Sequence, residues 1–541
     1  MKDISSTGSF INFYLNNYIY VDKTQYIRDL IKLERVFISR PRRFGKSLTL
    51  DTIATLFETG VEPYFKGTWI YDKWTEPTYP VLRLNFLDLD KYSLEHFKQK
   101  LNAIISSFAR DINVKNYEEK VEPEDTIYFL LDELRKEKRQ IVILIDEYDC
   151  QMTANINNET LYKQFQEKIK SFYATIKNKW PIKFLGITGV TRLKDVEIFS
   201  IGSDINDITN DSVYSQMIGF TRDEIKRYYI DYLKLAASCE NKCRVEEVTD
   251  TQIESMLDMM AQNYDGYCFD EFYKKKVFST WSVNKFFQSV VSNKFVYFGE
   301  YWYDNGGLPS ILVNYLKTHE LNIFEYLDKD KFLKVSSDDF KNPTALTTIN
   351  QNVLMCQTGY LTLRSDLNKT STVALGIPNG EIYKALNRLL ANNIFKGNTD
   401  ITDDYGRSLL EVGTVDDIIN LFNSALNSVS YDNYPIVSES SVQNMLKLYL
   451  LGAHQEVLSE VHEAKGRADL VVNTDNRRIV FEFKYAKNEA EAKSKLSEAV
   501  EQIKTRDYGN ILPKKNELIR IAAVFNADPK VRAFTENQIV P

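Results

Sequence analysis

Short, continuous apolar runs alternate with longer amphipathic stretches through the N-terminal part of the chain. Four such runs stand out: RVFIS (35–39), YPVLRLNF (79–86), QIVILI (140–145) and KFLGI (183–187). Runs of this length without polar alternation are typical of strands buried on both faces. The intervening stretches are long enough for crossover helices. The pattern therefore predicts an α/β domain built on a parallel sheet.

The pattern changes twice further along. From about residue 218, amphipathic stretches of mixed charge such as 221–235 and 251–263 predict a mostly helical region with some irregular segments. From about residue 440 it predicts a small second α/β unit, with helices at 442–451 and 489–504 and strands at 468–472, 478–483 and 519–525. We therefore expect three domains, at 1–217, 218–435 and 436–541.

Composition narrows the class of protein. The chain has 541 residues and a net charge of -7, which argues against a strongly basic DNA-coating protein but leaves room for a local basic patch. No apolar run is long enough for a membrane span, and the start lacks a signal-peptide pattern. The five cysteines are widely spaced, which argues against a disulfide framework. We expect a cytoplasmic protein without membrane contact.

The sequence Gly45-Lys46-Ser47 follows the 35–39 run and opens a helical stretch at 47–58. This is the context of a phosphate-binding loop, in which backbone N–H groups at a helix N-terminus point at phosphate oxygens. Lys46 would reach the β- and γ-phosphates of ATP and Ser47 would ligate Mg²⁺. The alternative is a chance Gly-Lys-Ser at the start of a helix.

The loop departs from the G-x-x-x-x-G-K-[ST] motif at its first position, where Arg40 replaces glycine. We expect a different entry into the loop, with Pro41 fixing the backbone. Arg42 and Arg43 would either bind phosphate or pair with surface acids, and both interpretations stay open.

A second motif strengthens the first. The run IVILIDEYD (141–149) ends in acids, as expected of the strand that pairs with a phosphate-binding loop. Asp146 would hold Mg²⁺ and Glu147 would polarise the attacking water. Thr188 could sense the γ-phosphate, and Arg192 is a weaker candidate. The residues expected to bind the nucleotide are Arg42, Arg43, Phe44, Gly45, Lys46, Ser47, Leu48, Asp146 and Thr188.

Acidic residues and a lysine gather on the two strands predicted near the C-terminus. Glu482 and Lys484 are two apart on one strand and point to the same face, and a hairpin can bring Asp469 alongside. Converging carboxylates repel each other unless they bind a metal, and Mg²⁺ there would support phosphodiester cleavage. The alternative is an exposed hairpin of mixed charge. The catalytic candidates are Glu147, Glu460, Asp469, Glu482, Lys484 and Gln502, and the metal candidates are Ser47, Asp146, Asp469 and Glu482.

The whole chain resembles AAA-ATPase-like proteins fused to a PD-(D/E)XK nuclease-superfamily domain. The motifs that carry the resemblance are YVDKT (20–24), RPRRFGKSLTL (40–50), IDEYD (145–149), ITGVTRL (187–193), YDGYCF (264–269), TGYLTL (358–363), LGIPNGEI (375–382), GRADLVV (466–472) and FEFK (481–484). Arg40 agrees with the loop of that family. The resemblance implies an ATPase core, a helical middle, a restriction-endonuclease-like C-terminal α/β domain and a bacterial source.

The leading hypothesis is an ATP-gated, Mg²⁺-dependent nuclease with ATP and Mg²⁺ as cofactors. Its expected partner is nucleic acid, with DNA favoured over RNA. A second hypothesis is a nucleotide-switched binding protein whose nuclease-like domain only grips nucleic acid or a protein. A third, a pure ATPase motor, lacks obvious helicase motifs. A homo-oligomer is common among AAA-like ATPases and stays open.

Overall fold

The computed structural model describes residues 1–541 except 178, 194–204, 303–309, 317–318, 320–322, 344, 396–405, 454–455, 464–465 and 511–513. The chain divides into two compact units. The first comprises residues 1–319 and 332–382, and the second comprises 320–331 and 383–541. The expected boundaries at 217 and 435 stay a prediction.

A five-stranded parallel sheet organises the first unit, as predicted. Its strands run in the order β2-β3-β4-β1-β5. Their bounds are β1 Arg35–Ser39, β2 Val81–Asn85, β3 Ile141–Asp146, β4 Ile182–Gly189 and β5 Asn206–Asp207. Every residue of β1 and β3 is buried, which explains their unbroken apolar runs.

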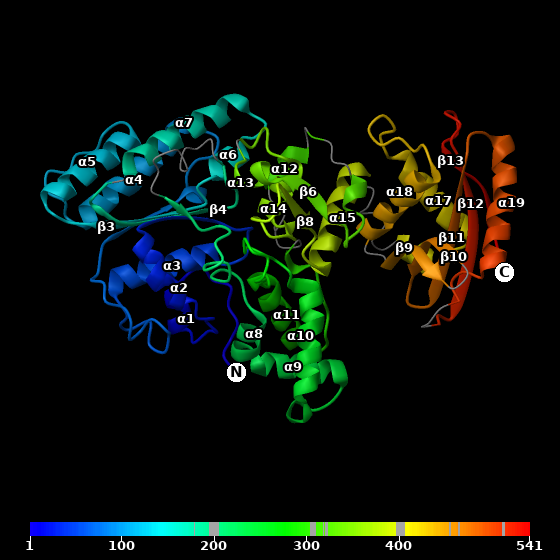
Figure 1. Ribbon diagram of the computed structural model, residues 1–541, viewed down its shortest axis with the longest axis horizontal. Helices are drawn as coiled ribbons and strands as arrows, with labels where there is room; N and C mark the ends of the chain where they lie inside the picture. Colours follow the sequence, from blue (N-terminus) through cyan, green and yellow to red (C-terminus); the bar gives the residue numbers. More distant parts are fainter. Residues whose placement is uncertain are drawn as a thin grey trace. The chain divides into compact units, whose positions relative to one another are not determined.

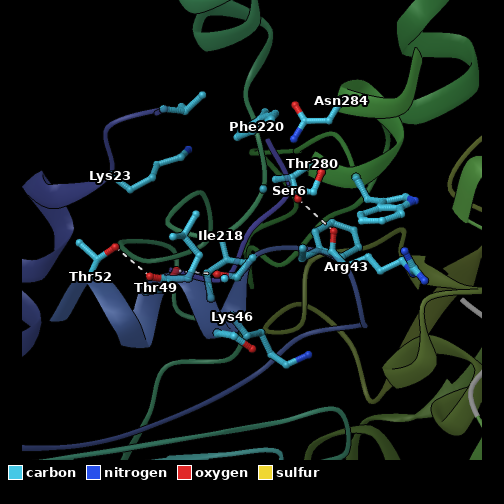
Figure 2. Close-up of a pocket in the computed structure, with 18 of the residues that line it drawn as sticks. Ser6, Lys23, Arg43, Lys46, Thr49, Thr52, Ile218, Phe220, Thr280 and Asn284 are labelled. Atoms are coloured by element: carbon cyan, nitrogen blue, oxygen red, sulfur yellow. Dashed lines mark hydrogen bonds between the residues drawn. The ribbon is translucent and has the colours of Figure 1, made fainter. Parts of the chain in front are cut away.

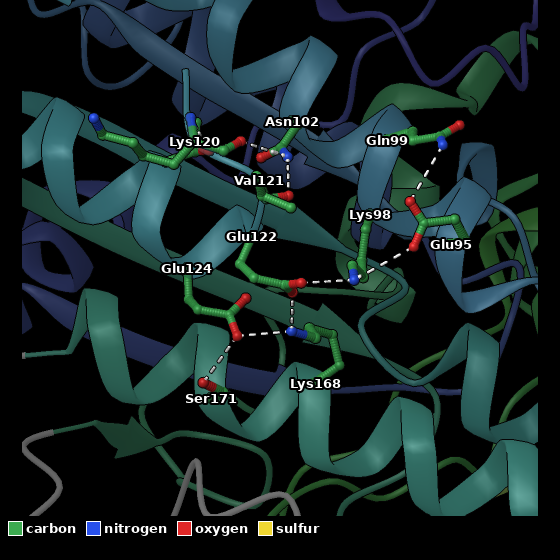
Figure 3. A network of polar contacts seen from close by, with 11 residues as sticks. Glu95, Lys98, Gln99, Asn102, Lys120, Val121, Glu122, Glu124, Lys168 and Ser171 are labelled. Atoms are coloured by element: carbon green, nitrogen blue, oxygen red, sulfur yellow. Dashed lines mark hydrogen bonds and ion pairs between the residues drawn. The ribbon is translucent and has the colours of Figure 1, made fainter. Parts of the chain in front are cut away.

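Helices cover both sides of this sheet, with α4, α5 and α7 on one side and α1, α2 and α3 on the other (Figure 1). Their bounds are α1 Phe10–Leu15, α2 Thr24–Leu30, α3 Lys46–Thr59, α4 Leu94–Asp111, α5 Pro123–Lys136, α6 Cys150–Ala154 and α7 Glu159–Ile176. A chain of ion pairs joins three of them, as Figure 3 shows. Glu122 accepts from Lys98 of α4 at 2.7 Å and from Lys168 of α7 at 2.5 Å, and Lys168 also contacts Glu124 of α5 at 2.7 Å.

Four helices form a separate core beside the sheet domain: α8 Arg222–Tyr228, α9 Ile230–Asn241, α10 Asp250–Tyr264 and α11 Thr280–Asn293. The stretch 221–235, expected to be continuous, is interrupted at Tyr229, whose φ is -113°. The break lets the Tyr229 ring stack on Phe287 at 5.3 Å in the core. The interruption is a single residue, because Tyr229 still donates to the Ile225 carbonyl at 2.9 Å and accepts from the Leu233 N–H at 2.9 Å.

The middle region also contains a small antiparallel sheet that the pattern did not predict. It has the order β6-β8-β7, with β6 Leu333–Ser336, β7 Thr362–Leu363 and β8 Thr372–Gly376. These strands are too short for their alternation to stand out. The helices around and after it are α12 Ser310–Leu316, α13 Ser337–Lys341, α14 Gln351–Thr358, α15 Gly380–Ile394, α16 Arg407–Val412 and α17 Val415–Asn427.

The second unit contains a mixed sheet in the order β13-β12-β11-β10-β9. Its elements are α18 Glu439–Gly452, β9 Glu456–Glu463, β10 Gly466–Asn473, β11 Arg477–Ala486, α19 Glu489–Arg506, β12 Glu517–Asn526 and β13 Ala533–Ile539. The predicted strands and helices of this part are all present, and β9 and β13 are additional. With the parallel sheet, the helical middle and this C-terminal α/β sheet, the predicted fold class is confirmed. No helix in the described part of the chain is both long and apolar enough to span a bilayer.

Candidate functional site

The phosphate-binding loop connects β1 to α3. Gly45 adopts a φ of 103°, in the left-handed region that a side chain disfavours, and Lys46 begins the helix directly after it. The Lys46 ammonium lies inside the loop, where it donates to the carbonyls of Arg40 at 3.1 Å and Pro41 at 3.3 Å. The lysine is therefore held at the place where phosphates bind in such loops.

A polar triad joins the loop to the two neighbouring strands. The Ser47 hydroxyl donates to Oδ2 of Asp146 at 2.5 Å. The Thr188 hydroxyl, on β4, donates to Oδ1 of the same carboxylate. The backbone N–H of Glu147 also donates to that oxygen, at 3.0 Å. The structure thus brings together Ser47, Asp146 and Thr188, all three of which the sequence proposed for the nucleotide site.

Glu147 lies one residue beyond β3, with its carboxylate 3.6 Å from the Lys46 ammonium. Burial raises the pKa of Glu147, and the nearby charges of Asp149 and Asp146 add to this effect while Lys46 opposes it. Its backbone has a φ of 51°, an uncommon conformation for a residue with a side chain. Such strained conformations persist where surrounding contacts hold the residue in place, and they cluster at functional sites.

Arg40, which replaces the first glycine of the motif, turns away from the phosphate side. Its guanidinium is buried and donates to the carbonyls of Ser39 at 2.9 Å and Thr209 at 2.5 Å. It also lies 4.1 Å above the ring of Phe269. Burial lowers the pKa of Arg40 to about 9. Arg40 thus supports the loop from behind, which explains how the loop tolerates the departure.

Arg42 and Arg43 remain beside the phosphate loop rather than in surface ion pairs. Among the residues that the structure describes, neither has an acidic partner within ion-pair distance, and the guanidinium of Arg43 stacks on Trp281 at 4.0 Å. Phe44 is buried with its ring edge on Tyr267 at 4.7 Å. Arg192 instead pairs with Asp207 and lines a different, small cavity.

A cavity of about 380 Å³ opens above the loop, within the size range of small-molecule and cofactor sites. Figure 2 shows side chains around it from the loop (Arg43, Lys46), the N-terminal segment (Ser6, Lys23) and the region after the sheet (Phe220, Asn284). The loop residues Arg42, Arg43, Phe44, Gly45, Lys46, Ser47 and Leu48 and also Glu147 all line it. Sequence reasoning missed the rest of the wall, because segments 5–8, 19–23, 217–220 and 280–284 meet only in the fold.

A second site lies where β10 and β11 pair. The antiparallel register reaches Leu470 opposite Phe481, so Asp469 and Glu482 adjoin the end of the pairing. The Asp469 carboxylate accepts from the backbone N–H of Phe483 at 2.8 Å. Lys484 donates to Oε1 of Glu482 at 2.9 Å. The hairpin therefore brings these three predicted residues together.

Glu482 is completely buried, and its Oε2 has no hydrogen-bond partner among the described residues. Burial and the neighbouring Asp469 charge raise the pKa of Glu482 to about 7, against the opposing effect of Lys484. A buried carboxylate oxygen without a partner is costly unless a ligand satisfies it. The donor set of Asp469 and Glu482 fits a hard divalent cation, since Mg²⁺ commonly takes one or two carboxylates with water and phosphate. No cluster of three or more His, Cys, Asp or Glu side chains with metal-site geometry occurs within the described residues.

A residue that sequence reasoning missed completes the group. Glu439, the first residue of α18, lies 3.3 Å from the Lys484 ammonium, which also contacts Glu482. In the sequence, Glu439 is marked only by its position directly after Ser438, the residue that caps α18. Gln443 of the same helix donates to the carbonyl of Asp469.

The two remaining candidates are Glu460 and Gln502. The backbone of Glu460 in β9 is flanked by the pairs Val461–Ala468 and Ser459–Leu470, which puts it opposite Asp469. The Glu460 side chain itself lies outside the described residues. Gln502 of α19 contacts the hydroxyl of Tyr508 at 3.5 Å.

Comparison with known proteins matches both sites. The family described as predicted AAA-ATPase matches residues 5–199, which include the phosphate-binding loop, Asp146 and Thr188. The PD-(D/E)XK nuclease superfamily matches residues 437–535, which include Glu439, Asp469, Glu482 and Lys484. This chain joins an AAA-ATPase-like domain to a PD-(D/E)XK nuclease-superfamily domain.

One relative matches almost the whole length of this chain. A protein of Azotobacter chroococcum mcd 1, described as an uncharacterized protein in the vnfD 5′ region, is 25% identical over 95% of this chain and 94% of its own length. Among solved structures, Cdc6p of Pyrobaculum aerophilum matches at 12% identity with a TM-score of 0.25, over 68% of this chain and 93% of its own. The Aeropyrum pernix Orc1 protein, solved in complex with DNA, matches at 11% identity with a TM-score of 0.27, over 71% and 97%.

Proposed function

We propose that this protein is an ATP-binding, ATP-gated nuclease that uses Mg²⁺ to cleave phosphodiester bonds of nucleic acid. Of the two substrates, we favour DNA over RNA. The observation that carries the proposal is the convergence of Asp469, Glu482 and Lys484 on one hairpin. A nuclease-like fold retained only for gripping would not need to bury Glu482 with an unsatisfied oxygen. The buried, unsatisfied oxygen of Glu482 therefore favours cleavage over the alternative of a nucleotide-switched binding protein.

In the nuclease-like domain, Asp469 and Glu482 are the residues that would hold the divalent cation. A bound cation supplies a water of lowered pKa and offsets the negative charge that develops on the phosphate. Lys484 contacts both Glu482 and Glu439. It therefore lies beside the residues that would hold the cation, and it would orient the attacking water. Gln502 and Glu460 are proposed as supporting residues at the edges of this site.

In the AAA-ATPase-like domain, the proposed nucleotide contacts are the backbone of residues 42–48 and the Lys46 ammonium. Ser47 and Asp146 would hold Mg²⁺, and Thr188 would respond to the γ-phosphate through the carboxylate it shares with Ser47. Glu147 would accept a proton from the attacking water, because burial has made it a stronger base than an ordinary carboxylate.

Contacts of the loop with the helical region support gating. The Thr280 hydroxyl donates to the Arg43 carbonyl at 3.0 Å, and the Trp302 indole donates to the Arg42 carbonyl at 3.4 Å. A loop that shifts when phosphate binds would therefore disturb α11 and Trp302 directly. This gives the nucleotide a route into the region that follows the ATPase domain.

The route continues along the chain through Glu381. This buried carboxylate accepts from the backbone N–H of Trp302 at 2.8 Å and from the Ser282 hydroxyl at 2.7 Å. Glu381 lies in the first turn of α15, which begins in the first compact unit and ends in the second. Trp302 thus contacts both the phosphate-binding loop and the start of a helix that leads into the second unit.

The proposal is tested by a cleavage assay on single- and double-stranded DNA and RNA, with and without ATP and Mg²⁺. Asp469→Asn keeps an acceptor for the Phe483 N–H but loses the charge, so we expect it to abolish cleavage and leave ATP binding unchanged. Lys46→Ala should abolish ATP binding and the response of cleavage to ATP. Lys487→Ala, an exposed lysine just beyond β11, is the matched control and should behave as wild type. Full cleavage by Asp469→Asn would refute the assignment and favour the binding protein.

A further inference from the structure

The last turn of α19 presents an arginine beside the nuclease-like site. Nη1 of Arg506 donates to the hydroxyl of Tyr508 at 2.7 Å. The Tyr508 ring is fully buried in the core between α19 and the sheet. A buried phenol is a fixed acceptor, so the guanidinium is held in place rather than free to sweep through solvent.

Gly466 makes room for this side chain. A Cβ atom at Gly466 would lie 2.5 Å from Cδ of Arg506 and 3.2 Å from its Nε. The closer of these contacts is too short for real side chains, so a side chain at residue 466 would force the Arg506 side chain to shift. Gly466 is the first residue of the GRADLVV motif, and it lies on the same strand as Asp469. The glycine of that motif is therefore explained by the position of Arg506.

The charges around Arg506 leave it available to an anion. Lys484 is already engaged by Glu482 and Glu439. Within the described residues, no carboxylate lies within ion-pair distance of Arg506. Its pKa is raised, first by the hydrogen bond to Tyr508 and then by the charges of Glu482 and Asp469, so it stays protonated at every working pH. Arg506 is thus a permanent cation close to the acidic pair without neutralising either member.

A polyanion that approaches Asp469, Glu482 and Glu439 meets three acids, and Lys484 alone cannot offset them. We propose that Arg506 binds a backbone phosphate of the nucleic acid at the nuclease-like site, and that Gly466 and Tyr508 position it. The planar guanidinium can donate two parallel hydrogen bonds to one phosphate, which a lysine cannot. This assignment rests on the proposed nuclease function and adds the residue that holds its substrate.

The test measures binding without cleavage. The full-length Asp469→Asn protein is titrated with a fluorescent DNA duplex and with its single strand over a range of salt concentrations. Adding Arg506→Gln should weaken binding about tenfold at low salt and reduce the slope of log affinity against log salt by about one. Arg506→Lys should recover the slope but only part of the affinity. Gly466→Ala should weaken binding with the charge intact, because it displaces the guanidinium.

Lys504→Gln is the matched control, since Lys504 is an exposed cation in the same last turn of α19. Hydrogen exchange of the β10 and β11 amides shows whether each variant is folded. If Arg506→Gln binds like Lys504→Gln, Arg506 only supports Tyr508 and the assignment is overturned. If neither DNA form binds to the parent protein, the phosphate assignment and DNA as the proposed substrate both fall. If Arg506 governs binding but the wild type cleaves nothing, the phosphate assignment holds and the nuclease proposal alone fails.

Discussion

The Ser47 hydroxyl donates to the Asp146 carboxylate at 2.5 Å across 99 residues of sequence. Ser47 lies in the helix that follows β1, and Asp146 is the last residue of β3. This hydrogen bond therefore forms only when both strands are correctly placed. The same carboxylate accepts from Thr188 on β4, the strand that lies between them. One buried aspartate therefore ties the phosphate-binding loop to both neighbouring strands.

Replacing this aspartate should separate nucleotide binding from magnesium dependence. Asp146→Asn keeps the shape of the side chain but removes a charge that contributes on the order of 2 kcal/mol to a charge-assisted contact. We expect affinity for Mg²⁺-ATP, measured by calorimetry, to fall at least about tenfold. Affinity for ATP in the presence of a chelator should change little. An equal loss in both conditions would mean that Asp146 only maintains the loop.

Glu147 is expected to act in hydrolysis rather than in binding. Its carboxylate is half-buried and lies 3.6 Å from Lys46, so a neutral side chain of the same size should be tolerated. Glu147→Gln should retain ATP affinity within about threefold and lower the rate of phosphate release about a hundredfold or more, as expected for loss of a general base. Phosphate release under single-turnover conditions is the measurement. Wild-type turnover by Glu147→Gln would assign the base to another residue.

Much of both sites could be predicted because they are local in sequence. Gly45-Lys46-Ser47 opens the helix after one apolar run, and Asp146-Glu147 ends another. Glu482 and Lys484 lie on one strand, whose alternation points both side chains to the same face. Asp469 followed from the hairpin, since the pairing of two adjacent strands is a short-range event. These residues needed no knowledge of the distant fold.

What was missed depends on tertiary packing. Glu439 is a helix N-terminal acid like many others, and only the packing of α18 against β11 brings it to Lys484. The wall of the nucleotide cavity combines segments 5–8 and 280–284, which no periodicity connects. Arg40 departs from the general motif, and its support role could not be predicted because its partners Thr209 and Phe269 lie far along the chain.

The ionisation of Glu482 should give the C-terminal domain a pH-dependent stability. The pKa of this carboxyl rises from 4.5 to about 7 in the fold. Between those values the folded state keeps a proton that the unfolded chain releases, so the free energy of unfolding falls as the pH rises and levels off above about 7. The full effect is on the order of 3 kcal/mol.

Hydrogen exchange of the β11 amides between pH 5 and pH 8, corrected for intrinsic rates and with divalent cations chelated, measures this dependence; the window brackets the pKa of about 7. Glu482→Gln should flatten it, because glutamine does not titrate. Glu517→Gln is the control, since Glu517 is exposed at the start of β12 and pairs with Arg477. A pH dependence that survives in Glu482→Gln would assign the titration to another group.

The contact between Trp302 and Glu381 should carry the nucleotide's effect on cleavage. Glu381 accepts from the Trp302 N–H and from Ser282, and it begins the helix that enters the second unit. Glu381→Gln keeps the shape but weakens both contacts, since a neutral amide accepts less strongly and one of its two ends cannot accept. We expect ATP affinity and ATP-free cleavage to stay within about threefold of wild type, because Glu381 lies in neither site. The change in cleavage rate on adding ATP should shrink about tenfold, a coupling loss of about 1–2 kcal/mol. Lys384→Gln, an exposed change on the same helix, should leave that response intact. If Glu381→Gln responds to ATP as fully as the control does, gating takes another route and the contact is purely structural.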